Sequence, residues 1–285
     1  MFIFLSSCKG QTNAGPPTDN TASETKAVDT SYGPTTMVRN TRRDRKGTML
    51  IAAAMGGVFR YDGRSFTNIT NKSISDGFWN VLEDRHGNLW FASTYSGAYY
   101  YDGTSFRKFS SIDGFSNADV TTIMEDRTGR FWFGTRGEAF SYDGKTFTVF
   151  KNKEGKSFKN VWSIIEDKKG NIWLGGTDGL WRYDGSKCTN ITQDTIVCIY
   201  EDKKGNIWTG SPTANKGTLS RYDEKSLSDE KPVVTKIKVE AEGQAKAVLG
   251  ISEAADGSIW LGTFNGVRRY DGYTVTDFKD KEVQK

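Results

Sequence analysis

The sequence predicts an all-β fold, a six-bladed β-propeller of four-stranded antiparallel blades preceded by a disordered N-terminal leash. Three observations predict it. A unit of about 40 residues recurs six times within the 285 residues. Each unit reads as four short strands separated by turn residues. Glycine (31 residues) and aromatic residues (13%) are abundant, a composition that favours strands and tight turns over a helical bundle.

The first eight residues, MFIFLSSC, look like the end of a bacterial lipoprotein signal. The segment from Leu5 to Cys8 resembles the lipobox that signal peptidase II cleaves, and the resemblance implies that Cys8 becomes a lipidated N-terminus. Secretory signals also carry a basic segment and an apolar core of about 7–15 residues. Because no Lys or Arg precedes Cys8 and the apolar run is only Phe2 to Leu5, the alternative is an apolar N-terminus without a targeting role.

Residues 9–35 are polar and rich in turn-forming residues. Such a segment buries too little apolar surface to offset the entropy of ordering it. We therefore predict a flexible linker over residues 9–35, between a truncated lipoprotein signal over 1–8 and a propeller over 36–285. No apolar run is as long as the 18 or more residues that indicate a membrane-spanning helix, so the predicted membrane attachment is through the lipid alone.

A Tyr-Asp pair marks each of the six repeats. Its Asp falls at positions 62, 102, 143, 184, 223 and 271. The predicted blades cover residues 36–70, 76–110, 118–151, 159–192, 195–238 and 246–280. An alternative, a degenerate seventh blade within residues 227–248, leaves little chain for four strands.

Within each repeat the four strands follow in order. The first is an apolar segment such as Val120 to Met124, just before a Glu-Asp pair and a tight turn. The second carries Trp, and the third ends in Tyr-Asp-Gly, a strong hairpin signal because Gly accepts a positive φ. The fourth holds Phe in several copies, such as Phe147. Because one blade cannot bury both its faces, we expect the blades to close a ring around an axis and shield the Trp, Tyr and Phe columns.

The repeat unit is similar to that of a known family. Residues 166–175, EDKKGNIWLG, and 179–185, GLWRYDG, resemble the two-component regulator propeller repeat. In that family such propellers form periplasmic sensor regions of hybrid histidine kinases, and they also occur as stand-alone lipoproteins. The resemblance implies a sensing or binding module in the bacterial cell envelope, periplasmic or associated with the outer membrane. No kinase or receiver segment follows the last repeat, so we do not expect the kinase activity itself.

Features that recur in every repeat are expected to serve the blade. The Glu-Asp pairs, such as Glu166-Asp167, are interpreted as turn chemistry, since Asp accepts hydrogen bonds from backbone N–H groups of the following turn. The cation-rich turns are interpreted as solvated turns beside these acids. The alternative is a basic ring that faces anionic head groups or an acidic glycan. Cys188 and Cys198 are predicted to be free thiols, with Cys198 a candidate for the wall of the central channel.

Catalytic and metal chemistry has little support in the composition. A single His, His86, leaves little room for a His-rich metal centre or a Ser-His-Asp triad. The formal net charge of +4 is too mild to indicate binding of nucleic acid. We therefore predict no catalytic residue, no metal and no cofactor.

Blade-specific residues at the other end of the propeller form the candidate ligand site. The loops between second and third strands offer Tyr95, Arg136, Asp178, Phe264 and Asn265, and the connections between blades offer Trp79 and Trp162. Aromatic side chains with a few polar groups in a concave surface suit a small molecule or a sugar. The alternative is that these aromatic residues fill the funnel.

The sequence thus predicts a lipid-anchored, non-catalytic sensor or binding propeller. It would recognise a small ligand, a glycan or a protein partner at the funnel end, with a two-component system as the candidate downstream pathway. One alternative is a propeller lyase or hydrolase, because streptogramin lyases have a distantly similar repeat. Those enzymes rely on His and a metal, whereas His86 lies in a turn at the opposite end. The other alternative is a protein-interaction scaffold.

Overall fold

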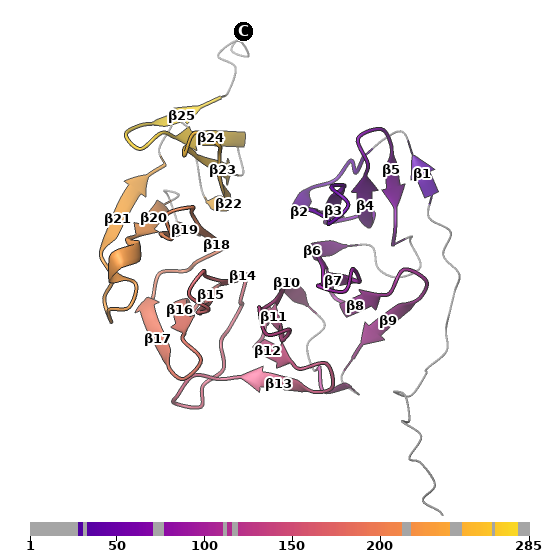
Figure 1. Ribbon diagram of the computed structural model, residues 1–285, viewed down its shortest axis with the longest axis horizontal. Coiled ribbons are helices and arrows are strands. Elements are labelled where there is room, and N and C mark those ends of the chain that lie inside the picture. The colour runs from indigo at the N-terminus through magenta and orange to yellow at the C-terminus, as the bar shows by residue number, and fades with distance from the viewer. Residues whose placement is uncertain are drawn as a thin grey trace, which may run out of the picture.

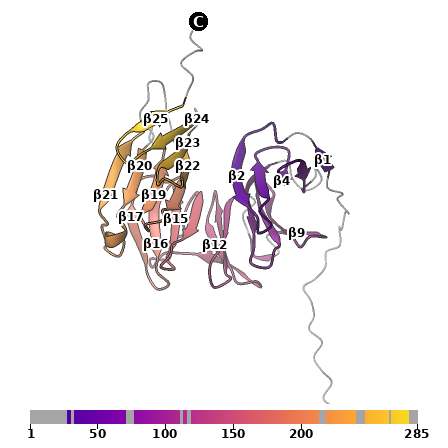
Figure 2. The same ribbon diagram turned by 45° about the horizontal axis from the view of Figure 1, so that its top comes forward.

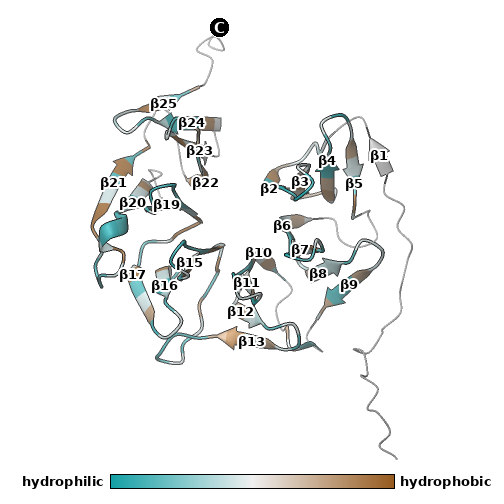
Figure 3. Ribbon diagram, viewed as in Figure 1, coloured by the Kyte–Doolittle hydropathy of each residue, from teal (hydrophilic) through white to brown (hydrophobic). Residues whose placement is uncertain are grey.

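The computed structural model describes residues 28–30, 33–70, 77–110, 113–115, 119–212, 218–239, 247–263 and 266–278. Cys8 and most of the predicted linker lie outside these residues. Six antiparallel sheets are arranged around a common centre (Figure 1). The predicted six-bladed β-propeller with four strands per blade is therefore confirmed. Figure 3 shows hydrophobic segments on strands of every blade, whereas many connecting turns are hydrophilic.

Each blade takes four consecutive strands, from the inner to the outer edge. Blade 1 holds β2 (Val38–Arg43), β3 (Met49–Ala53), β4 (Val58–Tyr61) and β5 (Phe66–Asn68). Blade 2 holds β6 (Phe78–Glu83), β7 (Leu89–Ser93), β8 (Gly97–Tyr101) and β9 (Phe106–Phe109). Blade 3 holds β10 (Val120–Glu125), β11 (Phe131–Thr135), β12 (Ala139–Tyr142) and β13 (Phe147–Phe150).

The second half of the chain repeats this order. Blade 4 holds β14 (Ser163–Glu166), β15 (Ile172–Gly176), β16 (Gly179–Tyr183) and β17 (Cys188–Thr192). Blade 5 holds β18 (Cys198–Glu201), β19 (Ile207–Ser211), β20 (Thr218–Tyr222) and β21 (Val234–Lys238). Blade 6 holds β22 (Val248–Glu253), β23 (Ile259–Thr263), β24 (Gly266–Tyr270) and β25 (Val275–Asp277).

Two segments differ from the expectations drawn from the sequence. Within the stretch expected to be a flexible linker, β1 (Val28–Thr30) pairs antiparallel with β5 and adds a fifth strand at the outer edge of blade 1. Within residues 227–248, β21 completes blade 5, so its residues do not start a seventh blade. A short 3₁₀ helix, Glu224–Ser226, precedes β21.

The Asp of each Glu-Asp pair organises the turn between the first two strands, as predicted. In blade 2, Asp84 accepts the backbone N–H groups of His86 and Asn88, both at 2.9 Å, and the indole N–H of Trp90 at 3.0 Å. The same indole–carboxylate bond recurs in blades 3, 4 and 5 at 2.8 Å: Trp132–Asp126, Trp173–Asp167 and Trp208–Asp202. One carboxylate therefore fixes both the turn and the buried Trp.

The Glu of each pair has a different role from the one predicted, because it joins neighbouring blades. The backbone N–H of Arg85 in blade 2 donates to Glu125 of blade 3 at 2.8 Å, and its guanidinium pairs with the same carboxylate. The guanidinium also donates to the carbonyl of Asp126 at 2.6 Å. The equivalent backbone bonds are Arg45–Glu83, Arg127–Glu166, Lys168–Glu201 and Lys203–Glu253. We call each such pair an inter-blade clamp, and it places an acid beside the predicted basic turns.

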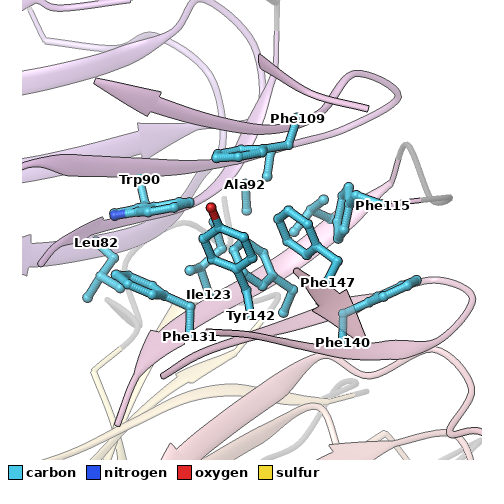
Figure 4. Close-up of a cluster of buried hydrophobic side chains, with 13 residues drawn as sticks. Leu82, Trp90, Ala92, Phe109, Phe115, Ile123, Phe131, Phe140, Tyr142 and Phe147 are labelled. Atoms are coloured by element: carbon cyan, nitrogen blue, oxygen red, sulfur yellow. The ribbon is translucent and has the colours of Figure 1, made fainter. Parts of the chain in front are cut away.

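Aromatic side chains fill the space between consecutive blades. The ring centroid of Trp90 in blade 2 lies 4.4 Å from that of Phe131 in blade 3 (Figure 4). It lies 5.9 Å from that of Phe133, also in blade 3. Its equivalents Trp132, Trp173 and Trp208 are likewise buried, each on the face that meets the next blade. Burying such large apolar surfaces is the main source of stability in a fold whose sheets cover one another.

Within the described residues, the ring is open between blade 6 and blade 1. The inner strands of consecutive blades contact one another along the chain, from β2–β6 to β18–β22, but no comparable contact joins β22 to β2. Figures 1 and 2 both show the two sheets on opposite sides of an opening. The expected closure of the ring is thus not what the structure shows. Trp260 of blade 6 consequently keeps 37% of its surface exposed.

Candidate functional site

A β-bulge near the start of the inner strand recurs in four blades. The register shifts between Val38 and Asn40, Phe78 and Asn80, Val120 and Thr122, and Val248 and Gly250. The bulged residues are Arg39, Trp79, Thr121 and Leu249, and Trp162 and Val197 directly precede the inner strands of blades 4 and 5. A bulge re-aims a side chain without ending the strand. The fold therefore presents a different residue from each blade at the same place on its innermost strand.

The bulged residues of blades 1 and 2 form a compact cluster with the β11–β12 loop. The guanidinium carbon of Arg39 lies 3.8 Å from the centroid of the Trp79 ring, and that of Arg136 lies 5.5 Å from it. Arg136 Nε pairs with the Asp119 carboxylate at 2.9 Å, and its backbone N–H donates to the Asp119 carbonyl at 3.1 Å. We call these four residues the arginine–tryptophan cluster.

Electrostatics give the cluster an excess of positive charge. Burial, together with the nearby Arg136 charge, lowers the pKa of Arg39 below its ordinary value. Burial raises the pKa of Asp119, although Arg136 opposes that rise. The cluster thus holds two guanidinium groups and one carboxylate, which pairs with Arg136. Arg39 Nε and Trp79 Nε1 are buried donors without a hydrogen-bond acceptor among the described residues. Such a cluster favours a ligand that brings negative charge and acceptor oxygens.

The structure joins only some of the residues that the sequence singled out. It brings Trp79 and Arg136 together and adds Arg39 and Asp119, which sequence reasoning missed. Tyr95 is 80% exposed at the tip of the β7–β8 loop, with a positive φ of 65°. Trp162 packs against the core between blades 5 and 6. Phe264 and Asn265 lie outside the described residues.

Asp178 borders a separate depression. Its carboxylate accepts the backbone N–H of Lys159 at 3.0 Å, and the carbonyl of Asp178 accepts the indole N–H of Trp181 at 3.1 Å. The depression has a volume of about 560 Å³ and is open, with Glu154 and Lys156 also on its wall. Its charged groups are of both signs and mostly solvated, so it offers less discrimination than the arginine–tryptophan cluster.

The two thiols are free, as predicted, but Cys198 does not line a channel. Both are buried, and burial raises the pKa of each to about 12. Cys198 Sγ donates to the carbonyl of Val248 at 3.3 Å, so it packs between blades 5 and 6. Among the described residues no group of His, Cys, Asp and Glu has a metal-binding arrangement. His86 lies in the β6–β7 turn, where its backbone N–H donates to Asp84.

Comparison with known families identifies the repeat. Residues 114–137, 155–178 and 190–213 match the family model described as two component regulator propeller. These three segments therefore match the two-component regulator propeller repeat that the sequence resembles. None of the curated protein sequences compared with this chain matches it.

Solved structures share the architecture at low identity. Virginiamycin B lyase from Staphylococcus aureus is 14% identical, with a TM-score of 0.68 over 90% of this chain and 89% of the lyase. PorZ of Porphyromonas gingivalis, a surface component of the type-IX secretion system, is 16% identical, with a TM-score of 0.62 over 81% of this chain. The extracellular domain of a protein named as a hybrid two-component system of B. thetaiotaomicron is 18% identical, with a TM-score of 0.51 over 84% of this chain.

These similarities establish a common propeller fold. This chain spans only 38% of the PorZ chain and 40% of the two-component chain. In the part of the chain that the structure describes, no helix has the length and apolarity needed to cross a membrane.

Proposed function

We propose that this protein is a non-catalytic binding module that recognises an anionic group, carried by a small ligand, a glycan or a protein partner, at the arginine–tryptophan cluster. The observation that carries the proposal is the pair of guanidinium groups, Arg39 and Arg136, that lie against one indole, with a single carboxylate, Asp119, paired with Arg136. Arginine in a fixed position recognises carboxylates by charge-assisted hydrogen bonds. The half-buried Trp79 adds an aromatic surface on which a sugar ring or a peptide plane can stack.

The blade-specific origin of these residues supports a binding role. The bulge itself is common to four blades and serves the architecture, but only blades 1 and 2 use it to place Arg39 beside Trp79. Arg136 is half exposed, so a ligand can reach it without displacing a blade. A repeat fold can vary these residues freely, because none of them forms an inter-blade clamp.

An enzymatic role has less support than binding. A catalytically inactive form of virginiamycin B lyase carries a His replaced by Ala, which identifies a His needed by that enzyme. The only His of this chain, His86, lies in a turn on the clamp side of blade 2. Asp119, the one carboxylate of the cluster, is paired with Arg136 and has no second acid within the cluster to act with it. Binding without turnover is therefore the function that these residues support.

The proposed setting is the bacterial cell envelope, with Cys8 lipidated and the propeller feeding a two-component system. The lipobox-like segment before Cys8 and the family of the repeats support this setting. Metabolic labelling with an alkyne-tagged fatty acid in a bacterial host tests the anchor. Label is expected on the wild-type chain and absent from Cys8→Ser. Equal labelling, or none on either chain, would refute a lipid on Cys8.

The binding proposal is tested by titration calorimetry with matched sugars. Glucuronate and galacturonate are the acidic probes, and glucose and galactose are the neutral controls. We expect the acidic sugars to bind and Arg136→Gln or Arg39→Gln to weaken them by about tenfold or more, since each removes a charged hydrogen-bond donor. Arg64→Gln, an exposed arginine on the outer turn of blade 1, is the control and should leave the affinity unchanged. Equal binding of neutral sugars, or no effect of the cluster variants, would contradict the proposal.

A protein-interaction scaffold remains the second candidate function. The observation that favours it is the open edge of the ring between blade 6 and blade 1, where apolar side chains face outward. A scaffold would bind its partner there and leave the arginine–tryptophan cluster unused.

A further inference from the structure

The face of blade 6 that points away from blade 5 is apolar and exposed. Its Trp260 is 37% exposed, whereas the equivalent Trp residues of blades 2 to 5 are at most 4% exposed. Val267 is 48% exposed, although its counterparts Ala98, Ala139, Leu180 and Leu219 are fully buried. Phe278 stacks on Trp260 with ring centroids 5.3 Å apart and is itself 53% exposed. In every other blade this face is covered by the next blade.

The facing side of blade 1 shows the complementary exposure. Val38 is 42% exposed, whereas the residues that start the inner strands of blades 2, 3 and 6, Phe78, Val120 and Val248, are fully buried. On β3, Met49 and Ile51 are only half-buried, while the corresponding strands of blades 2 to 5 are buried throughout. The two apolar faces lie on opposite sides of the opening seen in Figure 1.

The clamp residues change at this opening and nowhere else in the ring. Every other junction pairs a cation in one turn with a Glu of the next blade. At the opening the cation position of blade 6 is Ala255 and the Glu position of blade 1 is Arg43. Both are exposed. A direct junction of blade 6 with blade 1 would lack a clamp, whether the two blades belonged to one chain or to two copies.

We propose that the opening is a docking site for one further four-stranded blade of the same repeat type, supplied by a partner protein, with an acidic turn residue facing Arg43. A blade fits because it offers the two apolar faces required, as each blade of the ring does for its neighbours. One face must accept Trp260, Val267 and Phe278, and the other must cover Val38, Met49 and Ile51. The proposal goes beyond ligand recognition at the arginine–tryptophan cluster and does not depend on it.

Arg43 determines the charge that the partner must carry. In each clamp, a Lys or Arg in the turn of one blade lies beside a Glu of the next blade, as Arg85 lies beside Glu125. An incoming blade would bring its own turn to the same place beside Arg43. A lysine or arginine there would be repelled, whereas Asp or Glu would form a side-chain ion pair with Arg43. The guanidinium accepts no backbone N–H, so this pair would replace only the side-chain part of a clamp.

The test appends a copy of blade 4, residues 159–192, to the C-terminus of the full chain through a flexible linker. Four chains are compared: the copy carries either Lys168 or Lys168→Glu, and the host carries either Arg43 or Arg43→Glu. We expect the appended blade to raise the Tm and to protect Trp260 from acrylamide quenching. A host with Trp260→Phe gives the fluorescence of the other Trp residues, which is subtracted to obtain that of Trp260. The gain should be larger in the two combinations of opposite charge than in the two of like charge.

Three results would overturn the proposal. The appended blade stays sensitive to protease and leaves Trp260 quenchable in all four chains. The chain without the copy already protects Trp260, which means that the ring closes on itself. The chain without the copy is a dimer by light scattering that Trp260→Ser dissociates, which means that a second copy occupies the opening. Arg43→Glu without the copy should leave the Tm unchanged, because Arg43 is exposed, so a folding defect is recognised independently.

Discussion

The indole N–H of Trp208 donates to the Asp202 carboxylate at 2.8 Å, inside the junction between blades 5 and 6. The same carboxylate accepts the backbone N–H groups of Lys204 and Asn206 at 2.9 and 2.8 Å. The Asn206 side-chain amide donates to it as well, at 2.8 Å. Asp202 is buried, so its removal leaves four donors without their acceptor. This relationship recurs in four blades and makes the buried carboxylate a central element of each.

We expect Asp202→Ala to lower the free energy of unfolding by about 2–4 kcal/mol, because a buried indole N–H loses its acceptor and the turn loses its organiser. Asp271→Ala is the matched control. Asp271 also accepts two backbone N–H groups, those of Tyr273 and Thr274, but in an exposed outer turn. It should cost about 1 kcal/mol or less. Urea unfolding measures both, and equal losses would show that the buried indole bond adds nothing.

The same carboxylates make the fold sensitive to acid. Burial raises the pKa of Asp126 and Asp202, but hydrogen bonds from Trp and from the turn outweigh burial, so both pKa values lie below the ordinary one. A depressed pKa contributes stability that is present above about pH 4 and is lost as the pH falls through the folded-state pKa. We expect the Tm to drop below about pH 4. Asp202→Asn should lose less Tm between pH 5 and pH 2 than the wild type; parallel curves would contradict this linkage.

The inter-blade clamps are expected to contribute modestly. The Arg85 side chain is 39% exposed, so solvent screens its pairing with Glu125. Glu125→Gln should destabilise the chain by about 1 kcal/mol, and salt at about 0.5 M should reduce the difference. Glu154→Gln is the control, because Glu154 pairs with Lys156 at an exposed surface, 3.3 Å apart, without joining blades. An unchanged effect at high salt would indicate that hydrogen bonding, rather than charge, carries the clamp.

The repeat made the blades predictable, because each copy has the same strand order and similar turn residues. The Trp and Tyr-Asp-Gly positions placed strands and hairpins within a few residues of those observed, as for β15 and β16. The sequence did not predict the clamp, because Glu125 accepts a hydrogen bond from the preceding blade. Its partner lies 40 residues away, so the pair does not show within a single repeat. A comparison of cation and Glu positions between successive repeats would have found it, and would have shown that Ala255 and Arg43 break the series.

The candidate site was only half predictable for a geometric reason. Trp79 and Arg136 stood out as blade-specific residues, and the structure brings them together. Arg39 did not, since blade 1 is the most degenerate copy and a bulge leaves no mark in the sequence. Asp119 lies just before β10 and becomes part of the site only through its pairing with Arg136. Tyr95 and Asp178 are as blade-specific as Trp79, but Tyr95 is exposed at a loop tip and Asp178 borders a separate depression.

The buried thiols should be inert in the folded protein. Burial raises the pKa of Cys188 and Cys198 to about 12, so almost no thiolate exists near neutral pH. With Cys8 replaced by Ser to remove the third thiol, we expect no reaction with Ellman's reagent at pH 8 and two thiols after unfolding in guanidinium. Rapid reaction of the folded chain would mean that one of two junctions opens readily: that between blades 3 and 4, where Cys188 packs, or that between blades 5 and 6, where Cys198 packs.

Gly210 and Gly262 occupy the same position in blades 5 and 6, so substituting each compares a closed junction with the open one. A Cβ added at Gly210 would lie 2.4 Å from the carbonyl oxygen of Val248 and 2.5 Å from Cys198 Sγ, so blades 5 and 6 would have to move apart. A Cβ at Gly262 would meet nothing closer than 3.8 Å. Neither glycine has a positive φ, so Ala is compatible with both backbones. We expect Gly210→Ala to cost about 1–3 kcal/mol through overpacking and Gly262→Ala less than about 0.5 kcal/mol, measured by urea unfolding. A comparable loss at Gly262 would reveal that something already packs on β23 in solution, and the opening would then be closed in the isolated protein.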